Sequence, residues 1–288
     1  MAVILITGAN GQLGNEIRSV SGNFYGYDFI FTDIAELDIT DSSSTIDFIS
    51  KNKPDWIVNC AAYNSVDKAE TEPDKAILIN CTAVKNIAEA IKGSDCRFIH
   101  VSTDYVFDGN ACIPYNENML PAPGTEYGKS KLAGEKAAML HNNSMIIRTS
   151  WLYSRHGANF VKTIKSKARK NESLQVVFDQ AGTPTWAADL AEAIMKIISS
   201  VIRNQVAFNA GIYHYSNEGV CSWYDFAEAI IEEEGLDCRL HPILSKEFTA
   251  VAKRPCYSVL DKSKIKETYN LEIPHWRKSL LKCLAQMK

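Results

Sequence analysis

The feature that most constrains this chain is an apolar run that leads directly into a glycine-rich turn. Residues 3–6 read Val-Ile-Leu-Ile, three glycines follow within Thr7–Gly14, and a helix-forming segment comes next. Strand, glycine-rich turn and helix in this order are typical of a dinucleotide-binding unit. Gly8 permits the tight turn, Gly11 lets the backbone approach a pyrophosphate, and Gly14 lets the helix pack closely on the sheet. The phosphates would lie at the helix N-terminus, where free N–H groups favour an anion.

Three more residues of this turn, Asn10, Gln12 and Leu13, are expected to contact the dinucleotide as well. The glycines are spaced Gly-x-x-Gly-x-x-Gly, which differs from the more familiar Gly-x-Gly-x-x-Gly. An ordinary glycine-rich loop is therefore the alternative interpretation, and the flanking strand and helix favour the dinucleotide site over it.

Asp33 ends the second apolar run and lies nineteen positions after the last glycine of the turn. An acidic side chain at this place can hydrogen-bond the ribose 2′-hydroxyl of NAD and repel the 2′-phosphate of NADP. No Arg or Lys stands between Asp33 and Lys51 to bind that phosphate, so the pattern favours NADH over NADPH. A surface aspartate that closes a turn is the alternative. Asp38 is expected to accept from the adenine amino group, and Ile39 to cover the adenine ring.

Apolar strands alternate with helical patterns through the first half of the chain. Strands are predicted at 3–6, 29–31, 56–59, 97–102 and 145–148, and helices from about Gln12, Ser42, Pro73 and Glu126. This alternation predicts an α/β fold with a Rossmann-type, doubly wound parallel sheet that is covered by helices on both faces. We expect residues 1–150 to form the dinucleotide-binding domain.

The regular alternation of strands and helices ends near residue 150. Further strands are predicted at 174–178 and 212–215, and further helices at 187–202, 222–234 and 274–286. We expect 151–288 to form mainly a smaller mixed α/β substrate-binding domain, with a segment near 172–204 returning to the first domain. Ligands of parallel sheets bind beyond the carboxyl ends of the strands. The candidates there are Cys60, Ala61, Ala62 and Tyr63 after the third strand, and Ser102, Thr103 and Asp104 at the end of the fourth.

Tyr127 and Lys131 lie four residues apart in a predicted helix, so their side chains share one face. A free tyrosine titrates near ~10, and a cation a few Å away can lower its pKa by roughly 1–3 units. The phenol could then exchange a proton with an alcohol or carbonyl oxygen. Taken alone, this spacing is common by chance, and a surface tyrosine beside a solvated lysine is the alternative.

The composition excludes several other classes of protein. A net charge of −3 gives no general attraction to nucleic acid or to anionic membranes. Because the first strand is predicted to begin near residue 2, we expect no signal peptide, and no apolar run reaches membrane-spanning length. The eight cysteines form no Cys-x-x-Cys pair and the six histidines form no cluster. We therefore expect reduced thiols, a cytoplasmic location and no transition-metal site.

Together, these motifs make the chain similar to the extended short-chain dehydrogenase/reductase superfamily, and within it to the dTDP-4-dehydrorhamnose reductase family. The similar segments are 7–14, 59–62, 66–70, 102–107, Tyr127 with Lys131, 148–151, 159–160 and 254–255. The resemblance implies reduction of the C4 keto group of dTDP-4-dehydro-6-deoxy-L-mannose (dTDP-4-dehydrorhamnose) by NADH or NADPH. The product, dTDP-L-rhamnose, is a nucleotide sugar for cell-surface polysaccharide.

The resemblance also implies roles for single residues. Tyr127 would donate a proton, Lys131 would bind the nicotinamide ribose, and Thr103 would hydrogen-bond the reacting oxygen. Tyr105 stands where related 4,6-dehydratases have a glutamate, which argues against a dehydratase. The substrate contacts implied are Thr103, Asp104, Tyr105, Trp151, Asn159 and Arg254.

Members of this family are associated with a magnesium ion held by glutamates at a dimer contact. Glu16 matches one such position, but residues 187–189 read Ala-Ala-Asp where another glutamate is expected. The sequence therefore leaves the metal and a homodimer open. Two rival functions also remain: another NAD-dependent nucleotide-sugar epimerase or dehydratase, and a non-catalytic regulatory subunit that resembles the one of methionine adenosyltransferase.

Overall fold

Every residue from Ile4 to Thr7 in the first strand, β1 (Ala2–Thr7), is shielded from solvent, although successive side chains point to opposite faces. Only a sheet covered on both sides allows this. The computed structural model describes residues 1–287 and places β1 in a six-stranded sheet with the order β10-β5-β4-β3-β1-β2. All neighbouring strands of this sheet are parallel. The other strands are β2 (Tyr27–Thr32), β3 (Trp56–Asn59), β4 (Arg97–Thr103), β5 (Ser144–Thr149) and β10 (Gly211–His214).

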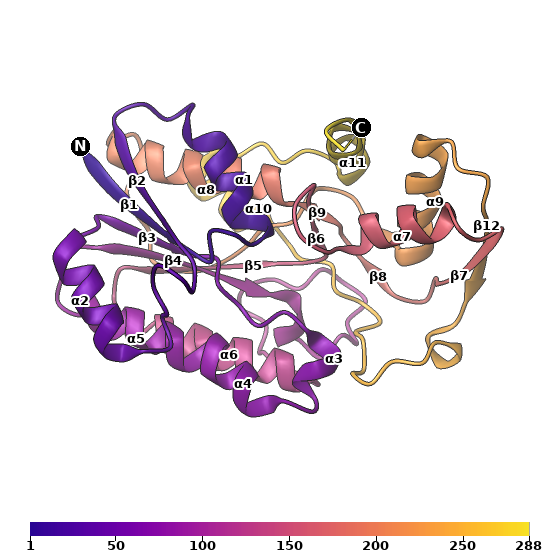
Figure 1. Ribbon diagram of the computed structural model, residues 1–288, viewed down its shortest axis with the longest axis horizontal. Coiled ribbons are helices and arrows are strands. Elements are labelled where there is room, and N and C mark those ends of the chain that lie inside the picture. Colours follow the sequence, from indigo (N-terminus) through magenta and orange to yellow (C-terminus); the bar gives the residue numbers. More distant parts are fainter. Residues whose placement is uncertain (288) are drawn as a thin grey trace.

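Two helical layers cover this sheet (Figure 1). Ile4 and Ile6 pack in one core cluster with α1 (Gln12–Ser21) and α8 (Ala187–Ile202). Leu5 points to the other face and packs with residues of three helices. These helices are α2 (Ser42–Asn52), α5 (Ala83–Ala90) and α6 (Glu126–Ala138). The α/β fold class and the doubly wound parallel sheet predicted from the sequence are therefore confirmed.

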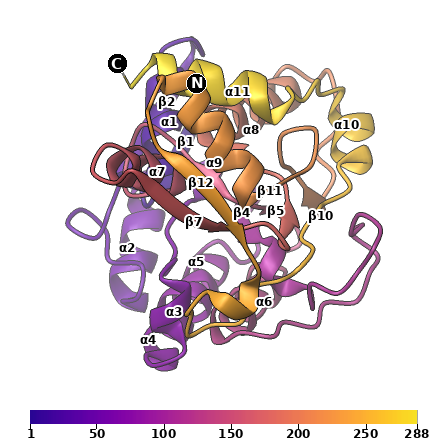
Figure 2. The same ribbon diagram turned by 90° about the vertical axis from the view of Figure 1, so that its right-hand side faces the viewer.

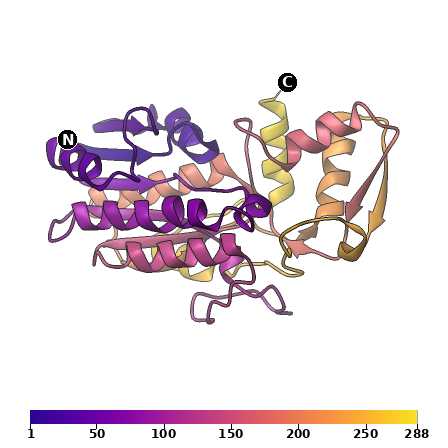
Figure 3. The same ribbon diagram turned by 60° about the horizontal axis from the view of Figure 1, so that its bottom comes forward.

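The order of the strands also places the ligand crevice. The strand β1 pairs with β2 on one side and with β3 on the other, so the order in which strands are added to the sheet reverses at β1. In open α/β sheets, ligands bind at the carboxyl ends of the strands where this reversal occurs. The smaller lobe lies beyond that end of the sheet, which brings it against the crevice (Figures 1 and 3).

The smaller lobe is built around its own aromatic core. Its parallel strand pair joins β7 (Ser173–Val177) to β12 (Arg239–Ile243). Figure 2 views this lobe end-on, with both strands and its helices toward the viewer. Tyr153, Trp186 and Phe226 are central to its core, which α11 closes through Trp276. The helices are α7 (Phe160–Ala168), α9 (Trp223–Glu234) and α11 (Trp276–Ala285).

Two predictions about the second half need correction. The strand predicted at 212–215 is β10, which forms the edge of the main sheet and does not belong to the smaller lobe. The return predicted near 172–204 is wrong in its first part, because β7 pairs with β12 in the smaller lobe. The returning segment begins at α8, and α10 (Ser263–Tyr269) packs on the same face through Ile265. Sequence spacing alone does not reveal which sheet a short strand joins.

Short elements complete the described part of the chain. They are α3 (Val66–Ala69), α4 (Pro73–Ile77), the π-helical η1 (Leu78–Thr82), η2 (Asp104–Val106), β6 (Leu152–Tyr153), β8 (Ala181–Gly182), β9 (Thr185–Trp186), β11 (Cys221–Ser222) and η3 (Ser245–Glu247). Within residues 1–287, no helix has the length and apolar character needed to cross a membrane.

Candidate active site

A cleft of about 570 Å³ opens at the carboxyl ends of β1, β2 and β3. Its lining includes nine residues that the sequence assigned to the cofactor: Gly8, Asn10, Gly11, Asp33, Asp38, Ile39, Cys60, Ala61 and Ala62. Glycine backbone, an adjacent helix N-terminus and apolar side chains together fit a dinucleotide.

The glycines of the first turn have distinct structural reasons. Gly8 has a φ of +66°, and a Cβ there would lie 2.5 Å from the backbone nitrogen of Ala61. Two turns at the sheet edge therefore touch through Gly8. Gly11 caps α1, and its nitrogen donates to the Gly8 carbonyl at 3.1 Å. A Cβ on Gly14 would lie 2.5 Å from Cα of Ala9, so Gly14 packs against the turn itself and not against the sheet as expected.

Asp33 holds this turn through its carboxylate. One oxygen accepts from the backbone nitrogen of Asn10 and the other from that of Ile34, each at 2.9 Å. Asp38 uses one oxygen in its own turn, where it accepts from the backbone nitrogen and the hydroxyl of Thr40. Both acids lie on the wall of the cleft, as the sequence suggested.

Four side chains that the sequence assigned to the cofactor have other partners. The side chain of Leu13 is buried in the core under α1, which leaves its backbone as the part that could contact a cofactor. The hydroxyl of Ser102 donates to Glu135 at 2.6 Å. The Tyr63 phenol donates to Glu72, and Gln12 accepts from the amide of Asn159. The three hydrogen bonds could not be predicted from the sequence, because each joins residues that lie in different segments of the chain.

Part of the cleft wall is formed by residues that were not predicted from the sequence. The additional residues are Thr7, Ile34, Leu37, Thr40, Asn64, Lys75, Leu78 and Ile79. Asn64 directly follows the segment predicted at the end of the third strand, so a wider window would have included it. Lys75 and its neighbours come from α4 and η1, which reach the cleft by packing and carry no local motif.

Tyr127 is buried and makes both aromatic and polar contacts. Its ring packs edge-on against Tyr105, with centroids 5.5 Å apart, and its phenol donates to Oδ1 of Asn64 at 3.5 Å. Burial raises the pKa of the Tyr127 phenol, and the nearby hydroxyl of Thr103 lowers it by less. The phenol therefore keeps its proton at neutral pH, as a proton donor must.

Lys131 does not act on the phenol as expected. Its buried ammonium donates to the carbonyl of Val101 at 2.7 Å. Burial lowers the pKa of Lys131 to about 8, while the carboxylate of Glu135 opposes that shift. The predicted lowering of the Tyr127 pKa by this lysine is wrong in this structure, because the desolvation of the phenol dominates.

Thr103 and Asp104 form a buried pair at the end of β4. The Thr103 hydroxyl donates to Oδ1 of Asp104 at 2.9 Å and accepts from the backbone nitrogen of Tyr105 at 3.2 Å. Burial raises the pKa of Asp104 to about 6. The ionised carboxylate thus fixes the direction of the Thr103 hydroxyl at neutral pH.

Arg254 reaches the same region from the other end of the chain. Its guanidinium donates to Oδ2 of Asp67 at 2.6 Å, and Oδ1 of Asp67 accepts from the backbone nitrogen of Ala252 at 3.0 Å. Arg254 and Tyr105 line a hollow of about 200 Å³. A partly buried arginine at such a hollow can bind a diphosphate through its planar fork.

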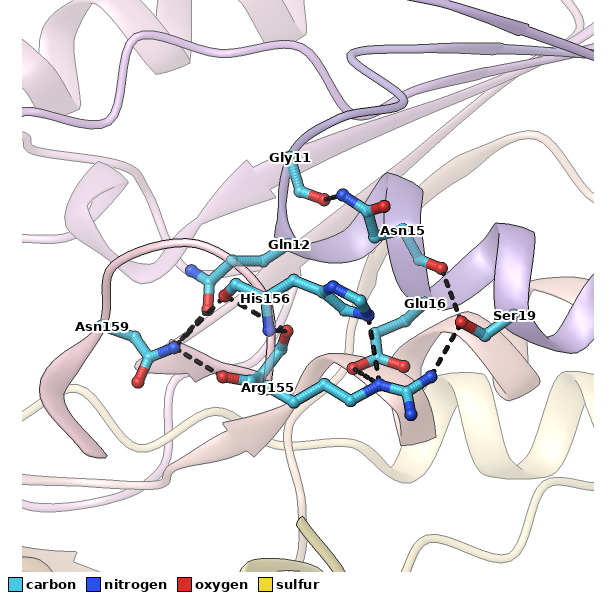
Figure 4. Close-up of polar contacts among 9 residues, drawn as sticks. Gly11, Gln12, Asn15, Glu16, Ser19, Arg155, His156 and Asn159 are labelled. Carbon is cyan, nitrogen blue, oxygen red and sulfur yellow. Dashed lines mark hydrogen bonds and ion pairs between the residues drawn. The ribbon is translucent and has the colours of Figure 1, made fainter. Parts of the chain in front are cut away.

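Asn159 is the N-cap of α7 and links the two lobes (Figure 4). Its Oδ1 accepts from the backbone nitrogen of Lys162 at 3.1 Å. Its amide donates to Gln12 at 3.0 Å and to the carbonyl of Ser154 at 2.6 Å. The predicted substrate contact Asn159 therefore also joins the start of α1 to the loop before α7.

Glu16 does not have the surroundings of a magnesium ligand. It is buried, and the nearest cation is Arg155, whose Nε lies 4.0 Å from Oε1 (Figure 4). Asp189, in the segment where a second ligand was considered, accepts from Asn217 and Ser279. No group of three His, Cys, Asp or Glu suited to a metal occurs in residues 1–287. Within this chain, the Arg155 guanidinium therefore supplies the positive charge nearest to Glu16.

Comparison with known proteins places this geometry in a family. The whole chain, residues 1–288, matches the family described as RmlD substrate binding domain. It is 41% identical to the spore coat polysaccharide biosynthesis protein SpsK of Bacillus subtilis, with 99% of this chain and 98% of that protein covered. It is 39% identical to a dTDP-4-dehydrorhamnose reductase of Aggregatibacter actinomycetemcomitans, with 97% of each covered.

A solved structure agrees with these sequence matches. The dTDP-4-dehydrorhamnose reductase of Bacillus anthracis in complex with NADP superposes with a TM-score of 0.93 at 38% identity, over 99% of this chain and 100% of that one. The match thus extends over both lobes and includes the cleft at the end of the main sheet. This chain belongs to the RmlD substrate binding domain family.

Proposed function

We propose that this protein reduces the C4 keto group of dTDP-4-dehydrorhamnose to give dTDP-L-rhamnose, with NADH or NADPH as the reductant. The carrying observation is a buried Tyr127 beside Thr103, next to a cleft that fits a dinucleotide, in a chain that is 39% identical to such a reductase over 97% of its length. Its role would be nucleotide-sugar biosynthesis for cell-surface polysaccharide.

The reaction needs a hydride at C4 and a proton at the oxygen. Bound in the cleft, the reduced nicotinamide supplies the hydride. Tyr127 gives its proton to the oxygen that becomes negative as the carbonyl is reduced, and Thr103 hydrogen-bonds the same oxygen. Lys131 is held by the Val101 carbonyl and would bind the nicotinamide ribose. Solvent then reprotonates Tyr127.

The substrate would be held by residues from both lobes. Asp104 and Tyr105 would lie beside the reacting carbonyl. Trp151 and Asn159 would contact the substrate from the smaller lobe, and Arg254 would pair with the diphosphate. A cytoplasmic location and a homodimer also belong to the proposal. The dimer would have to form without a magnesium bridge at Glu16, and light scattering on the purified protein tests its mass.

The decisive assay mixes purified protein, dTDP-4-dehydrorhamnose and either reduced cofactor. We expect stoichiometric oxidation of the cofactor and formation of dTDP-L-rhamnose. No oxidation of either cofactor would refute the proposal. A cofactor that co-purifies and is recycled would instead indicate an epimerase or dehydratase. Activity only with a co-purifying enzyme would indicate a regulatory subunit.

A further inference from the structure

Trp151 has an unusual backbone for a large aromatic residue. Its φ is +47°, in the left-handed region that bulky side chains seldom adopt unless their surroundings hold them there. It follows β5 at the carboxyl edge of the main sheet, where ligands of this fold bind. Its carbonyl accepts from the backbone nitrogen of Thr185 at 3.2 Å. This strained residue is thus held by a contact with another segment.

A second indole covers Trp151. The rings of Trp151 and Trp223 are stacked, with centroids 3.5 Å apart and planes 7° apart. Trp223 is the first residue of α9, whose start is fixed by a reciprocal capping box between Ser222 and Asp225. Phe160, at the start of α7, packs on Trp223 with centroids 4.5 Å apart. Trp223 therefore joins the starts of α7 and α9 to Trp151.

Trp151 and Ser258 both lie against Gly182, which places Trp151 near the Thr103–Asp104 pair. A Cβ on Gly182 would lie 2.5 Å from Cε2 of Trp151 and 2.7 Å from the hydroxyl of Ser258. That hydroxyl in turn lies near Asp104, the partner of Thr103. Within residues 1–287, neither Oδ2 of Asp104 nor the Ser258 hydroxyl completes a hydrogen bond of normal geometry, although both are buried. Buried polar groups without such a bond are rare in native structures, and a ligand or an ordered water is one explanation for them.

We propose that Trp223 is a positioning residue, which holds the indole of Trp151 as a wall of the substrate site beside Ser258 and Asp104. This inference rests on the proposed function, because it assigns the wall to the nucleotide-sugar site. The stack supplies the support that the strained backbone of Trp151 needs. Gly182 supplies the space, since any side chain there would displace the indole.

The wall contacts the substrate before and during the reaction alike. Loss of such a contact raises KM and leaves kcat nearly unchanged, whereas loss of an interaction made only in the transition state lowers kcat. An aromatic pair contributes enough to change affinity by about three- to tenfold. We therefore expect Trp223→Leu to raise KM for the nucleotide sugar by about three- to tenfold, with kcat within about twofold.

The experiment compares Trp223→Leu, Trp223→Phe and Gly182→Ala with the control Trp276→Phe. Trp276 belongs to the same core cluster as Trp223 and packs edge-on against Phe226. Stacked indoles couple their ultraviolet transitions, so circular dichroism reports the Trp151–Trp223 pair directly. Both Trp223 variants should lose this band, while Trp276→Phe should keep it. Trp223→Phe should keep KM close to that of the unaltered enzyme, because its ring still stacks on Trp151, whereas Trp223→Leu should raise it. Affinity for the reduced cofactor should stay normal in all four variants.

Several outcomes would overturn the proposal. A Trp223→Leu enzyme with normal KM, or one in which kcat falls and KM does not change, would show that Trp223 does not act through a substrate wall. Equal effects in Trp276→Phe would indicate general damage to the lobe. If the unaltered enzyme binds thymidine diphosphate and the indole band responds, but no keto sugar turns over, the wall stands and the proposed reaction fails.

Discussion

The two lobes hold their parts of the site by different physical means. In the larger lobe, the residues sit on turns at the ends of parallel strands, where backbone contacts such as Gly8 against Ala61 fix them. In the smaller lobe, Trp151 and Arg254 are held by side chains from distant segments, Trp223 and Asp67. The first kind of site follows from local sequence. The second kind depends on packing between elements that are distant in the sequence. We therefore expect substitutions there to change substrate affinity in smaller steps.

The largest effect should come from Tyr127→Phe, in the larger lobe. The ring stays and the proton donor goes, so kcat should fall by about 10²–10⁴-fold. Folding and cofactor binding should persist, as thermal unfolding and cofactor titration would show. The loss in Tyr127→Phe with Lys131→Ala should be far smaller than the product of the single losses. Near-normal kcat in Tyr127→Phe would move the acid to another residue, Tyr105 first.

The smaller lobe is tested next, through Arg254→Ala. Charge-assisted hydrogen bonds to a diphosphate contribute about 1.5–3 kcal/mol, which corresponds to a KM raised by about 10- to 150-fold. Lys253→Ala is the matched control, since Lys253 lines the same hollow beside Arg254. Steady-state kinetics with the nucleotide sugar measures both. Equal effects in the two variants would indicate a general electrostatic attraction and not a specific contact.

Two glycines of the larger lobe distinguish the cost of a close backbone contact from the cost of a positive φ. Gly8 and Gly26 both have positive φ, but a Cβ on Gly26 would meet no atom within 4 Å. Gly8→Ala should therefore lose about 1–3 kcal/mol more stability than Gly26→Ala, because a rigid backbone contact is overpacked. Urea unfolding measures the difference. Equal losses would mean that the contact with Ala61 relaxes without cost.

As the pH rises through the titration of Lys131, stability should increase and activity should decrease. Its pKa in the folded protein is about 8, below the ordinary value of 10.5, so the unfolded chain binds more protons between these values. The contribution of Lys131 to stability should therefore rise with pH through this window. Activity should fall there, because the ammonium is lost. Lys131→Met should remove the rise in stability, measured by urea unfolding at each pH. A rise that persists would assign it to another group.

The smallest effect concerns the choice of cofactor. The Asp33 carboxylate lines the cleft and opposes a 2′-phosphate, so NADH should serve at least as well as NADPH in kcat/KM. Asp33→Ser should shift the ratio several-fold toward NADPH. The NADP complex of the Bacillus anthracis reductase makes this comparison informative. A clear preference of the unaltered protein for NADPH would show that the carboxylate serves the turn alone, through Asn10 and Ile34.

The helices and strands were largely predictable where local pattern and tertiary packing agree. The predicted 56–59 strand coincides with β3, an apolar run that is buried on both faces. The predicted 187–202 helix coincides with α8, whose apolar residues recur at helical spacing and are buried against the sheet. The strand at 212–215 has the same pattern but was assigned to the wrong lobe. Its partner β5 is more than sixty residues away, and no local feature encodes that pairing.

For the site, the sequence alone determined the glycine turn, the strand ends and the spacing of Tyr127 and Lys131. These follow from backbone geometry and helix periodicity, which act over a few residues. Only the tertiary structure decided the protonation of Tyr127, the partner of Lys131 and the support of Trp151. Desolvation, the direction of a buried ammonium and an indole stack all depend on atoms that the fold brings from elsewhere. Local sequence sets which groups are present, and packing sets their electrostatic and steric surroundings.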